Sequence, residues 1–253
     1  MEYMFGSGLL WGTPQQDASG NAISNPSPVL FGTMQDVSVD LSFDLKQLYG
    51  QNQFPVALGR GKGKIDCKAH IASINGAMLN TLFFGQSVTS SGIANKYDTT
   101  GTAIPSTPFT ITPTVPSSGT WAQDLGVRRA DGTLMTRVAS APATGQYSVA
   151  AGVYTFAAAD TTVIVFIDYQ YTFASTTSKN SNVSNLPMGY APAFRADLLM
   201  PYAGKNLIMT LYWCIGSKLS LATKLDDFTI PEFDFQAAAN PNTGQVITWG
   251  TSE

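Results

Sequence analysis

The sequence predicts a mainly β protein with one flanking α-helix and long loops. Three observations support this fold class: several runs alternate between apolar and polar residues, one segment alone has a helical period, and 23 glycines and 14 prolines punctuate the chain. Side chains of a strand alternate between two faces, whereas side chains on one face of a helix recur about every 3.6 residues. No internal repeat of fixed period emerges. At 253 residues the chain is long enough for one large β domain or two small domains, and we predict a single domain over residues 1–253.

The first 28 residues are rich in Gly, Pro, Ser, Asn and Gln, and their main apolar anchor is Leu9, Leu10 and Trp11. Such a composition is typical of irregular backbone. We predict an N-terminal arm over residues 1–28 that lies across another surface.

The stretch "DVSVDLSFDL" alternates without fault over residues 36–45. Its odd-numbered residues are all apolar and its even-numbered residues are all Asp or Ser, so one face is predicted to be dry and the other wet. The acidic side chains of the wet face are Asp36, Asp40 and Asp44.

The stretch "LGRGKGKIDCKAHI" over residues 58–71 combines glycines with cations and raises the question of a phosphate-binding loop. No hydroxyl residue follows either of the first two lysines and no four-residue spacer separates the glycines, so the P-loop pattern fails. Its polar residues from Arg60 to His70, including Lys62, Lys64 and Lys68, are all even-numbered, which predicts a second strand with one wet face. A loop at "YGQNQFPVA" would join the two strands as a hairpin and place Asp beside Lys.

The segment "SINGAMLNTLFFG" has the helical period. Ser73 is a candidate N-cap, Ile74, Ala77, Met78 and Leu82 share one face, and Gly85 supplies a left-handed stop. We predict a helix of about three turns that packs on a sheet.

The remainder of the chain alternates Pro- and Gly-rich loops with further strands, and a β-rich insertion over about residues 100–176 would separate two halves of a core domain. A long loop or an extended edge segment is predicted over 86–119, where four prolines exclude a central strand. A long strand over 161–173 has two mostly apolar faces, so it is either central in a sandwich or covered by a neighbouring subunit. The other predicted features are a hairpin turning at 130–132, a short strand pair over 145–156, a polar linker over 177–185 and strands near 191–200, 205–214, 218–222 and 228–236.

The composition limits the classes of function. The formal net charge of −3 disfavours a dedicated nucleic-acid binder, whose affinity comes from a surplus of Lys and Arg. Only 12% of residues are charged, against about 25% in an ordinary domain. Either much of the surface is covered by other subunits or the surface is neutral and rich in Ser, Thr, Asn and Gln.

Cellular location is indicated by three absences. Cys67 and Cys214 are too few for a disulfide framework and too far apart in sequence for a metal clasp, so both are predicted to be core residues in a reducing compartment. The N-terminus has no basic leader, and no apolar run approaches the ~18 residues of a membrane helix. We expect a soluble protein made in the cytoplasm, with no membrane partner.

Catalysis has little support in the sequence. His70 is the single histidine and is predicted on the wet face of a strand, and no nucleophile motif accompanies it. Asp226, Asp227, Glu232 and Asp234 cluster, but a turn and a solvated strand face explain them better than a pair of catalytic acids. We therefore predict no enzyme, no cofactor and no metal site.

Two binding hypotheses remain open. The basic strand face could be a nucleic-acid groove, a salt-bridged face or a contact for an acidic partner, although no aromatic residue lies among its cations. Alternatively, Trp121, Trp213, Tyr190 and Tyr202 on a neutral surface suggest a carbohydrate-binding or adhesin-like β module.

Four blocks of the chain form a recognisable set: "LSFDLKQLYGQNQFPVALGRGKGKI", "GAMLNTLFFG", "MGYAPAFRADL" and "SKLSLATKLDDFTIPEFDF". They resemble tail tube proteins of tailed double-stranded DNA bacteriophages, and the resemblance covers roughly residues 30–85 and 186–236. In the middle region, "VRRADGTLMTRV" and "GVYTFAAAD" resemble segments of similar phage structural proteins.

The resemblance implies a β-sandwich or barrel-like core with a flanking helix, and a structural role in the virion. Such subunits form hexameric rings that stack into a tube around a tape-measure protein, join baseplate and tail-terminator proteins, and conduct DNA during ejection. A contractile tail adds a sheath. Candidates for the lumen wall are Asp36, Asp40, Asp44, Lys62, Lys64 and Lys68, and candidates for assembly contacts are Leu9, Leu10, Trp11, Tyr49, Gln51, Asn52 and Phe54.

Overall fold

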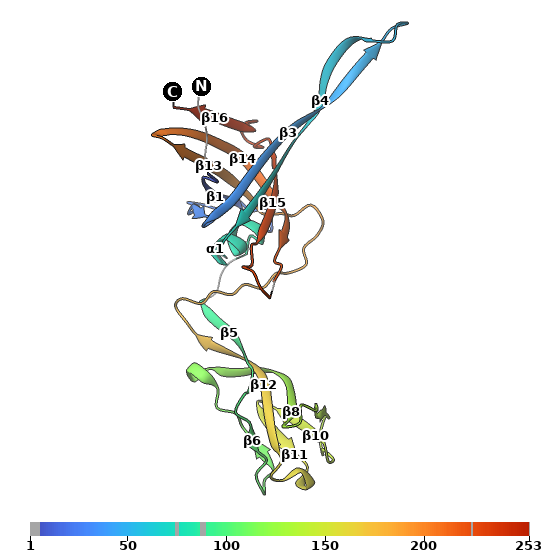
Figure 1. Cartoon of the computed structure of the whole chain (residues 1–253), viewed down its shortest axis with the longest axis vertical. Helices are drawn as coiled ribbons and strands as arrows, with labels where there is room; N and C mark the ends of the chain where they lie inside the picture. Colours follow the sequence, from blue (N-terminus) through green and yellow to red (C-terminus); the bar gives the residue numbers. More distant parts are fainter. Residues whose placement is uncertain (1–5, 74–75, 87–89, 224, 253) are drawn as a thin grey trace. The chain divides into compact units, whose positions relative to one another are not determined.

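The computed structural model describes residues 6–73, 76–86, 90–223 and 225–252, and it divides into two compact units (Figure 1). Unit 1 comprises Met1–Val88 and Ser181–Glu253, and unit 2 comprises Thr89–Asn180. Strands dominate both units, so the predicted mainly β class is confirmed. Unit 2 occupies the place of the insertion predicted over about residues 100–176, with wider bounds.

Unit 1 contains one eight-stranded sheet. Seven strands follow the order β2-β1-β13-β14-β15-β4-β3. The eighth strand, β16, lies outside this order and pairs with β14. All these pairings are antiparallel. The strands are β1 (Leu9–Gln16), β2 (Val29–Leu30), β3 (Met34–Tyr49), β4 (Pro55–Ile71), β13 (Ala193–Tyr202), β14 (Lys205–Ser220), β15 (Glu232–Ala238) and β16 (Ile247–Thr251).

The N-terminal segment is more regular than predicted, because β1 is a full member of the sheet. It pairs with β13 from Leu9 opposite Leu199 to Gln16 opposite Ala193, with a register shift between Pro14 and Gln16. Gly12 within this strand serves packing, since a Cβ there would overlap with Leu82 and Phe31. The prediction of an irregular arm was therefore wrong over residues 9–16.

Strand β14 joins two runs that were predicted as separate strands. It continues through Gly216, where the register with β15 shifts between Gly216 and Lys218. A Cβ on Gly216 would lie 2.8 Å from the ring of Phe83 and 3.3 Å from that of Phe233. The glycine thus allows the strand to pass close beneath two aromatic rings.

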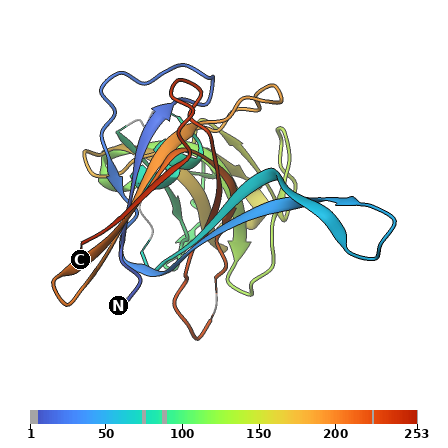
Figure 2. The same cartoon turned by 90° about the horizontal axis from the view of Figure 1, so that it is seen from above.

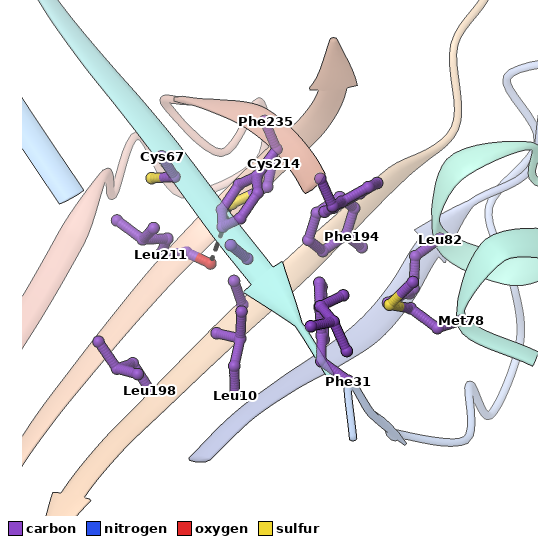
Figure 3. Packing of buried hydrophobic residues seen from close by; sticks show 14 of the residues in the cluster. Leu10, Phe31, Cys67, Met78, Leu82, Phe194, Leu198, Leu211, Cys214 and Phe235 are labelled. Atoms are coloured by element: carbon purple, nitrogen blue, oxygen red, sulfur yellow. Dashed lines mark hydrogen bonds between the residues drawn. The ribbon is translucent and has the colours of Figure 1, made fainter. Parts of the chain in front are cut away.

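The core of unit 1 is formed by one face of this sheet together with the helical segment (Figure 3). Four phenylalanines lie at its centre, with ring centroids of Phe31 and Phe233, and of Phe194 and Phe235, both 5.4 Å apart. Cys67 and Cys214 are buried and unpaired, as predicted. Burial raises the pKa of the Cys67 thiol to about 12 and that of the Cys214 thiol further.

The helix is shorter than predicted. A single turn, α1 (Gly76–Met78), runs into the wider π-helical turn η1 (Leu79–Phe83). Met78 and Leu82 face the core as expected, and Gly85 ends the segment with φ of 59°. The Ser73 hydroxyl accepts a hydrogen bond from the Thr33 backbone N–H at 3.5 Å, and the predicted helical position Ile74 lies outside the described residues.

Unit 2 contains two four-stranded sheets with a core of its own. In the first sheet β12 is central and pairs with three antiparallel neighbours, which confirms the strand predicted over 161–173. The predicted pair over 145–156 is also confirmed, as β10 against β11. The strands are β5 (Ser91–Lys96), β6 (Thr102–Ala103), β8 (Thr120–Arg129) and β12 (Ile164–Ala174), and β7 (Thr110–Ile111), β9 (Thr136–Arg137), β10 (Gln146–Ala150) and β11 (Val153–Phe156); short 3-10 turns cover Pro116–Ser118 and Ala158–Asp160.

Candidate assembly and lumen surfaces of unit 1

The hairpin of β3 and β4 is the most prominent feature of unit 1. Its distal half projects beyond the other strands of the unit (Figures 1 and 2). Near its base, Ile65, Cys67, Ala69 and Ile71 are buried in the core, whereas residues 40–64 are exposed on both faces. The hairpin was predicted from the sequence, but its extension beyond the other strands of the sheet was not.

One face of the projecting hairpin is apolar and uncovered. Leu41, Phe43 and Leu45 of β3 follow Val37 and Val39, which pack against the core. Leu58 of β4, opposite Gln47, lies on the same face. The exposed fractions of the four distal side chains run from 41% to 64%. The row of apolar side chains that packs against the core thus continues along the hairpin, where no other described element of unit 1 covers it.

A bulge in β4 changes which residues share this face. Phe43 lies opposite Gly63, but Leu45 lies opposite Arg60, so β4 uses one residue more than β3 between these pairs. A β-bulge of this kind shifts the alternation of side chains on the bulged strand. Arg60 consequently lies over the ring of Phe43, 4.7 Å from its centre. The prediction that Arg60 shares the wet face of Lys64 and Lys68 was wrong.

The opposite face of the hairpin carries the charged side chains predicted for the lumen. Asp36 lies opposite His70 and Asp40 opposite Asp66, whereas Ser42 and Ser38 lie opposite Lys64 and Lys68. The expected cross-strand pairs of Asp with Lys are therefore absent between the described residues of β3 and β4. Asp36 binds the His70 ring at 2.6 Å, and Lys64 binds Asp66 of its own strand at 2.9 Å.

Strand β15 supplies the countercharges that the sequence analysis missed. Asp234 lies opposite Lys68 and Glu232 opposite His70 on the far side of β4. Glu232 also accepts a hydrogen bond from Lys218 of β14 at 2.7 Å. This hydrogen bond lowers the pKa of Glu232 and raises that of Lys218. Lys68 of β4 and Lys218 of β14 therefore face carboxylates of β15 rather than those of β3.

The remaining lumen candidates lie further out. Asp44 and Lys62 flank the bulge, and neither makes an ion pair with another residue of the described segments. A Cβ at Gly61 would lie 3.2 Å from the Asp44 carbonyl oxygen and 3.3 Å from Cε of Lys46. Asp44 and Lys46 of β3 therefore lie next to Gly61 at the bulge.

The assembly candidates fall into two groups. At the hairpin tip, Tyr49, Gln51, Asn52 and Phe54 are all exposed, with Phe54 78% exposed. On β1, Leu9 is exposed and Trp11 half-buried, but Leu10 belongs to the core. Leu10 is therefore unavailable for contact with a second subunit, because adjacent residues of a strand point to opposite faces.

The carboxylates considered for catalysis lie in two different settings. Asp226 and Asp227 are exposed in the loop before β15, while Glu232 and Asp234 belong to the charge ladder. The lowered pKa of Glu232 is opposite to the raised pKa of a general acid. Across the segments that the structure describes, no three His, Cys, Asp or Glu side chains are grouped to hold a metal ion.

The most buried carboxylates belong to unit 2 and are engaged in structural bonds. Asp168 accepts two hydrogen bonds from Arg128, at 2.9 and 3.1 Å. Asp160 binds Arg129 and the backbone N–H of Gly145, and Asp124 accepts hydrogen bonds from the hydroxyls of Tyr147 and Tyr154. Such pairing is what a buried charge requires.

Neither the models of known protein families nor the curated protein sequences contain a match to this chain. The described helical segments are also too short to cross a bilayer.

Proposed function

We propose that the chain is the structural subunit of a bacteriophage tail tube, which forms hexameric rings that stack into a hollow tube for double-stranded DNA. The observation that carries the proposal is the uncovered apolar face of the β3–β4 hairpin. A second copy of the chain is the natural cover, since the sequence resemblance is to self-assembling proteins.

Covering this face would supply a substantial part of the energy needed for assembly. Fully burying a large apolar side chain contributes roughly 1.5–3 kcal/mol. Leu41, Phe43, Leu45 and Leu58 together would offset a large part of the entropic cost of association, which is on the order of 4–15 kcal/mol. Neighbouring subunits in a ring would supply this cover.

The free edge of β3 also supports assembly with a second subunit. Among the described strands β3 pairs with β4 alone, so the other edge of this 16-residue strand is open. Open edges invite pairing with other chains, and closure of strands into a continuous barrel removes them. A ring in which β3 pairs with a neighbouring subunit would satisfy these backbone groups.

The charged face suits the wall of a DNA conduit. It combines six carboxylates with five lysines: Asp36, Asp40, Asp44, Asp66, Glu232 and Asp234 with Lys46, Lys62, Lys64, Lys68 and Lys218. A slight excess of negative charge would repel phosphates weakly and let DNA slide without binding. In the assembled virion, the same tube would enclose the tape-measure protein and meet the baseplate, the terminator and, in a contractile tail, the sheath.

Assembly can be tested on the purified protein by negative-stain microscopy and light scattering at increasing concentration. We expect hollow rings or tubes for the wild type. Leu45→Asp should abolish them, because it places a charge on the apolar face. Ser42→Asp adds the same charge to the opposite face of the same strand and should leave subunit assembly intact.

The outcome against the proposal is equally definite. A protein that stays monomeric at all concentrations, and whose Leu45→Cys variant reacts with a thiol reagent as fast as an exposed cysteine even with baseplate and tape-measure proteins present, would contradict assembly through this face.

A further inference from the structure

A hollow of about 420 Å³ lies in unit 1, away from the hairpin. It is bordered by the end of β1, the loop that follows β1, the middle of β14 and the turn after β15. Its polar and aromatic wall consists of Gln15, Gln16, Trp213, Asn240 and Asn242, and small or apolar residues including Ile23 and Pro26 complete it. No lining residue is charged.

The carboxamide groups of the wall are largely unused. Gln15, Gln16 and Asn242 make no side-chain hydrogen bond within the described segments. The Oδ1 atom of Asn240 accepts hydrogen bonds from the backbone of Asn242 at 2.9 Å and of Thr243 at 3.3 Å, which leaves its Nδ2 group free to donate. A carboxamide offers both donor and acceptor groups. The hollow therefore gathers several donor and acceptor groups that bond to no other side chain of the described segments.

Two irregularities of the sheet border this hollow. The register of β1 shifts between Pro14 and Gln16, and β14 inserts an extra residue between Leu211 and Cys214, in the stretch that contains Trp213. Bulges re-aim side chains and are common beside binding sites. The strand irregularities thus coincide with the polar and aromatic part of the wall.

The rim of the hollow has a second aromatic side chain. Gly20 adopts φ of 87°, and a Cβ there would lie 3.1 Å from Nε2 of Gln16 and 3.7 Å from the ring of Tyr190. A Cβ at this position would lie tightly against the Gln16 carboxamide and in ordinary contact with the Tyr190 ring. Tyr190, which is 53% exposed, thus lies beside Gly20.

We propose that this hollow binds a neutral saccharide. Hydroxyl groups both donate and accept hydrogen bonds, as the carboxamides do, and the apolar faces of a sugar ring suit Trp213 and Pro26. An anion or a cation would find no countercharge, and an apolar ligand would leave the carboxamides unpaired. The volume lies within the usual range for ligand sites, ~300–1,000 Å³. This inference goes beyond the tube function and does not depend on it.

The test is calorimetric titration of the full-length protein with maltohexaose, cellohexaose and chitohexaose, each up to about 10 mM, a range that covers weak affinities near 1 mM. We expect saturable binding of at least one of them. Trp213→Ala should weaken that binding by about tenfold or more, which corresponds to the loss of one good contact. Asn242→Ala, on an exposed turn, should weaken it measurably without a risk to folding.

Trp249→Ala is the matched control, because Trp249 is an exposed tryptophan of the same unit outside the hollow. It should bind as the wild type does. Absence of binding for all three oligosaccharides would overturn the proposal, as would equal affinity of the wild type, Trp213→Ala and Asn242→Ala proteins. Because assembly is measured separately, either result leaves the tube function untouched.

Discussion

The guanidinium of Arg60 lies over the ring of Phe43, 4.7 Å from its centre, on the uncovered apolar face of the hairpin. This contact exists because the bulge in β4 moves Arg60 to the face opposite the lysines that follow it in the sequence. The planar guanidinium can cover an aromatic ring while it stays hydrated. In the single subunit, Arg60 thus shields part of the surface that we propose to be buried on assembly.

Replacement of Arg60 tests the register of the hairpin. We expect Arg60→Ala to lower the free energy of unfolding by about 0.5–1 kcal/mol, the usual value of an exposed cation–π contact. Lys62→Ala removes a neighbouring cation that contacts no ring and should change stability by less. Urea unfolding of both variants measures the difference, and equal effects would mean that the Arg60 contact contributes nothing.

Charge reversal on the wet face should depend on position. Lys64 binds Asp66, and Asp66 lies opposite Asp40 on the neighbouring strand β3. Lys62, in contrast, has no ion pair among the described residues. Lys64→Glu would bring three carboxylates together and should cost roughly 0.5–1 kcal/mol more than Lys62→Glu, within the range of surface charge effects.

Urea unfolding at low and high salt measures this difference. It should shrink strongly at about 1 M salt, where the Debye length is only ~3 Å. Equal destabilisation by the two variants, or a difference that salt leaves unchanged, would count against an electrostatic role for Lys64.

Features that depend on neighbouring residues in the chain could be predicted from the sequence, whereas features that depend on a partner strand could not. Alternation within 36–45 and 58–71 correctly indicated two strands of one hairpin, because the period of a strand is written in adjacent residues. The displacement of Arg60 could not be read in the same way, since a bulge is defined only by the partner strand. Its one local hint was the pair Gly61 and Gly63, as glycine within a strand often marks a bulge.

Contacts between distant segments were the least predictable. Glu232 and Asp234 were assigned to a solvated strand face, but their role depends on the pairing of β15 with β4, which are separated by about 160 residues. The hollow is a similar case. Trp213 was noticed as an aromatic on a neutral surface, yet the carboxamides beside it come from two other segments, and no local pattern joins them.

Gly216 offers a test of packing with a closely matched control. Ala at this position would place a Cβ 2.8 Å from the Phe83 ring, beside the fully buried Phe233. We expect a loss of about 1–3 kcal/mol in the free energy of unfolding, as for other overpacked cores. Gly250→Ala, on β16, has no atom within 4 Å of the new Cβ. It should be neutral or stabilising by up to about 1 kcal/mol, because alanine restricts the unfolded chain.

Chemical denaturation of these two glycine variants gives the answer directly. Similar stability of Gly216→Ala and Gly250→Ala would show that the ring of Phe83 moves aside at little cost, and that the close approach of β14 is not a requirement of the fold.

Stability should fall at alkaline pH, and the cysteines of unit 1 should contribute to the fall. Burial raises the pKa of Cys67 to about 12, and burial likewise raises the pKa of Cys214, Tyr147 and Tyr154. In the unfolded chain a thiol ionises near pH 8.5 and a tyrosine near pH 10, both approximate reference values. A raised pKa in the folded state means that the stabilisation is complete below the unfolded pKa and is lost as the pH rises above it.

For each thiol the loss can reach at most about 1.4 kcal/mol per pH unit, beginning near pH 8.5 and continuing towards the folded pKa of the group. Urea midpoints measured from pH 7 to pH 10 should therefore decrease. A Cys67→Ala, Cys214→Ala double variant should show a shallower decrease that begins only as the tyrosines start to ionise. If wild type and variant keep parallel midpoints across this range, the two thiols ionise equally easily in the folded and unfolded states, and the account of their burial given above is wrong.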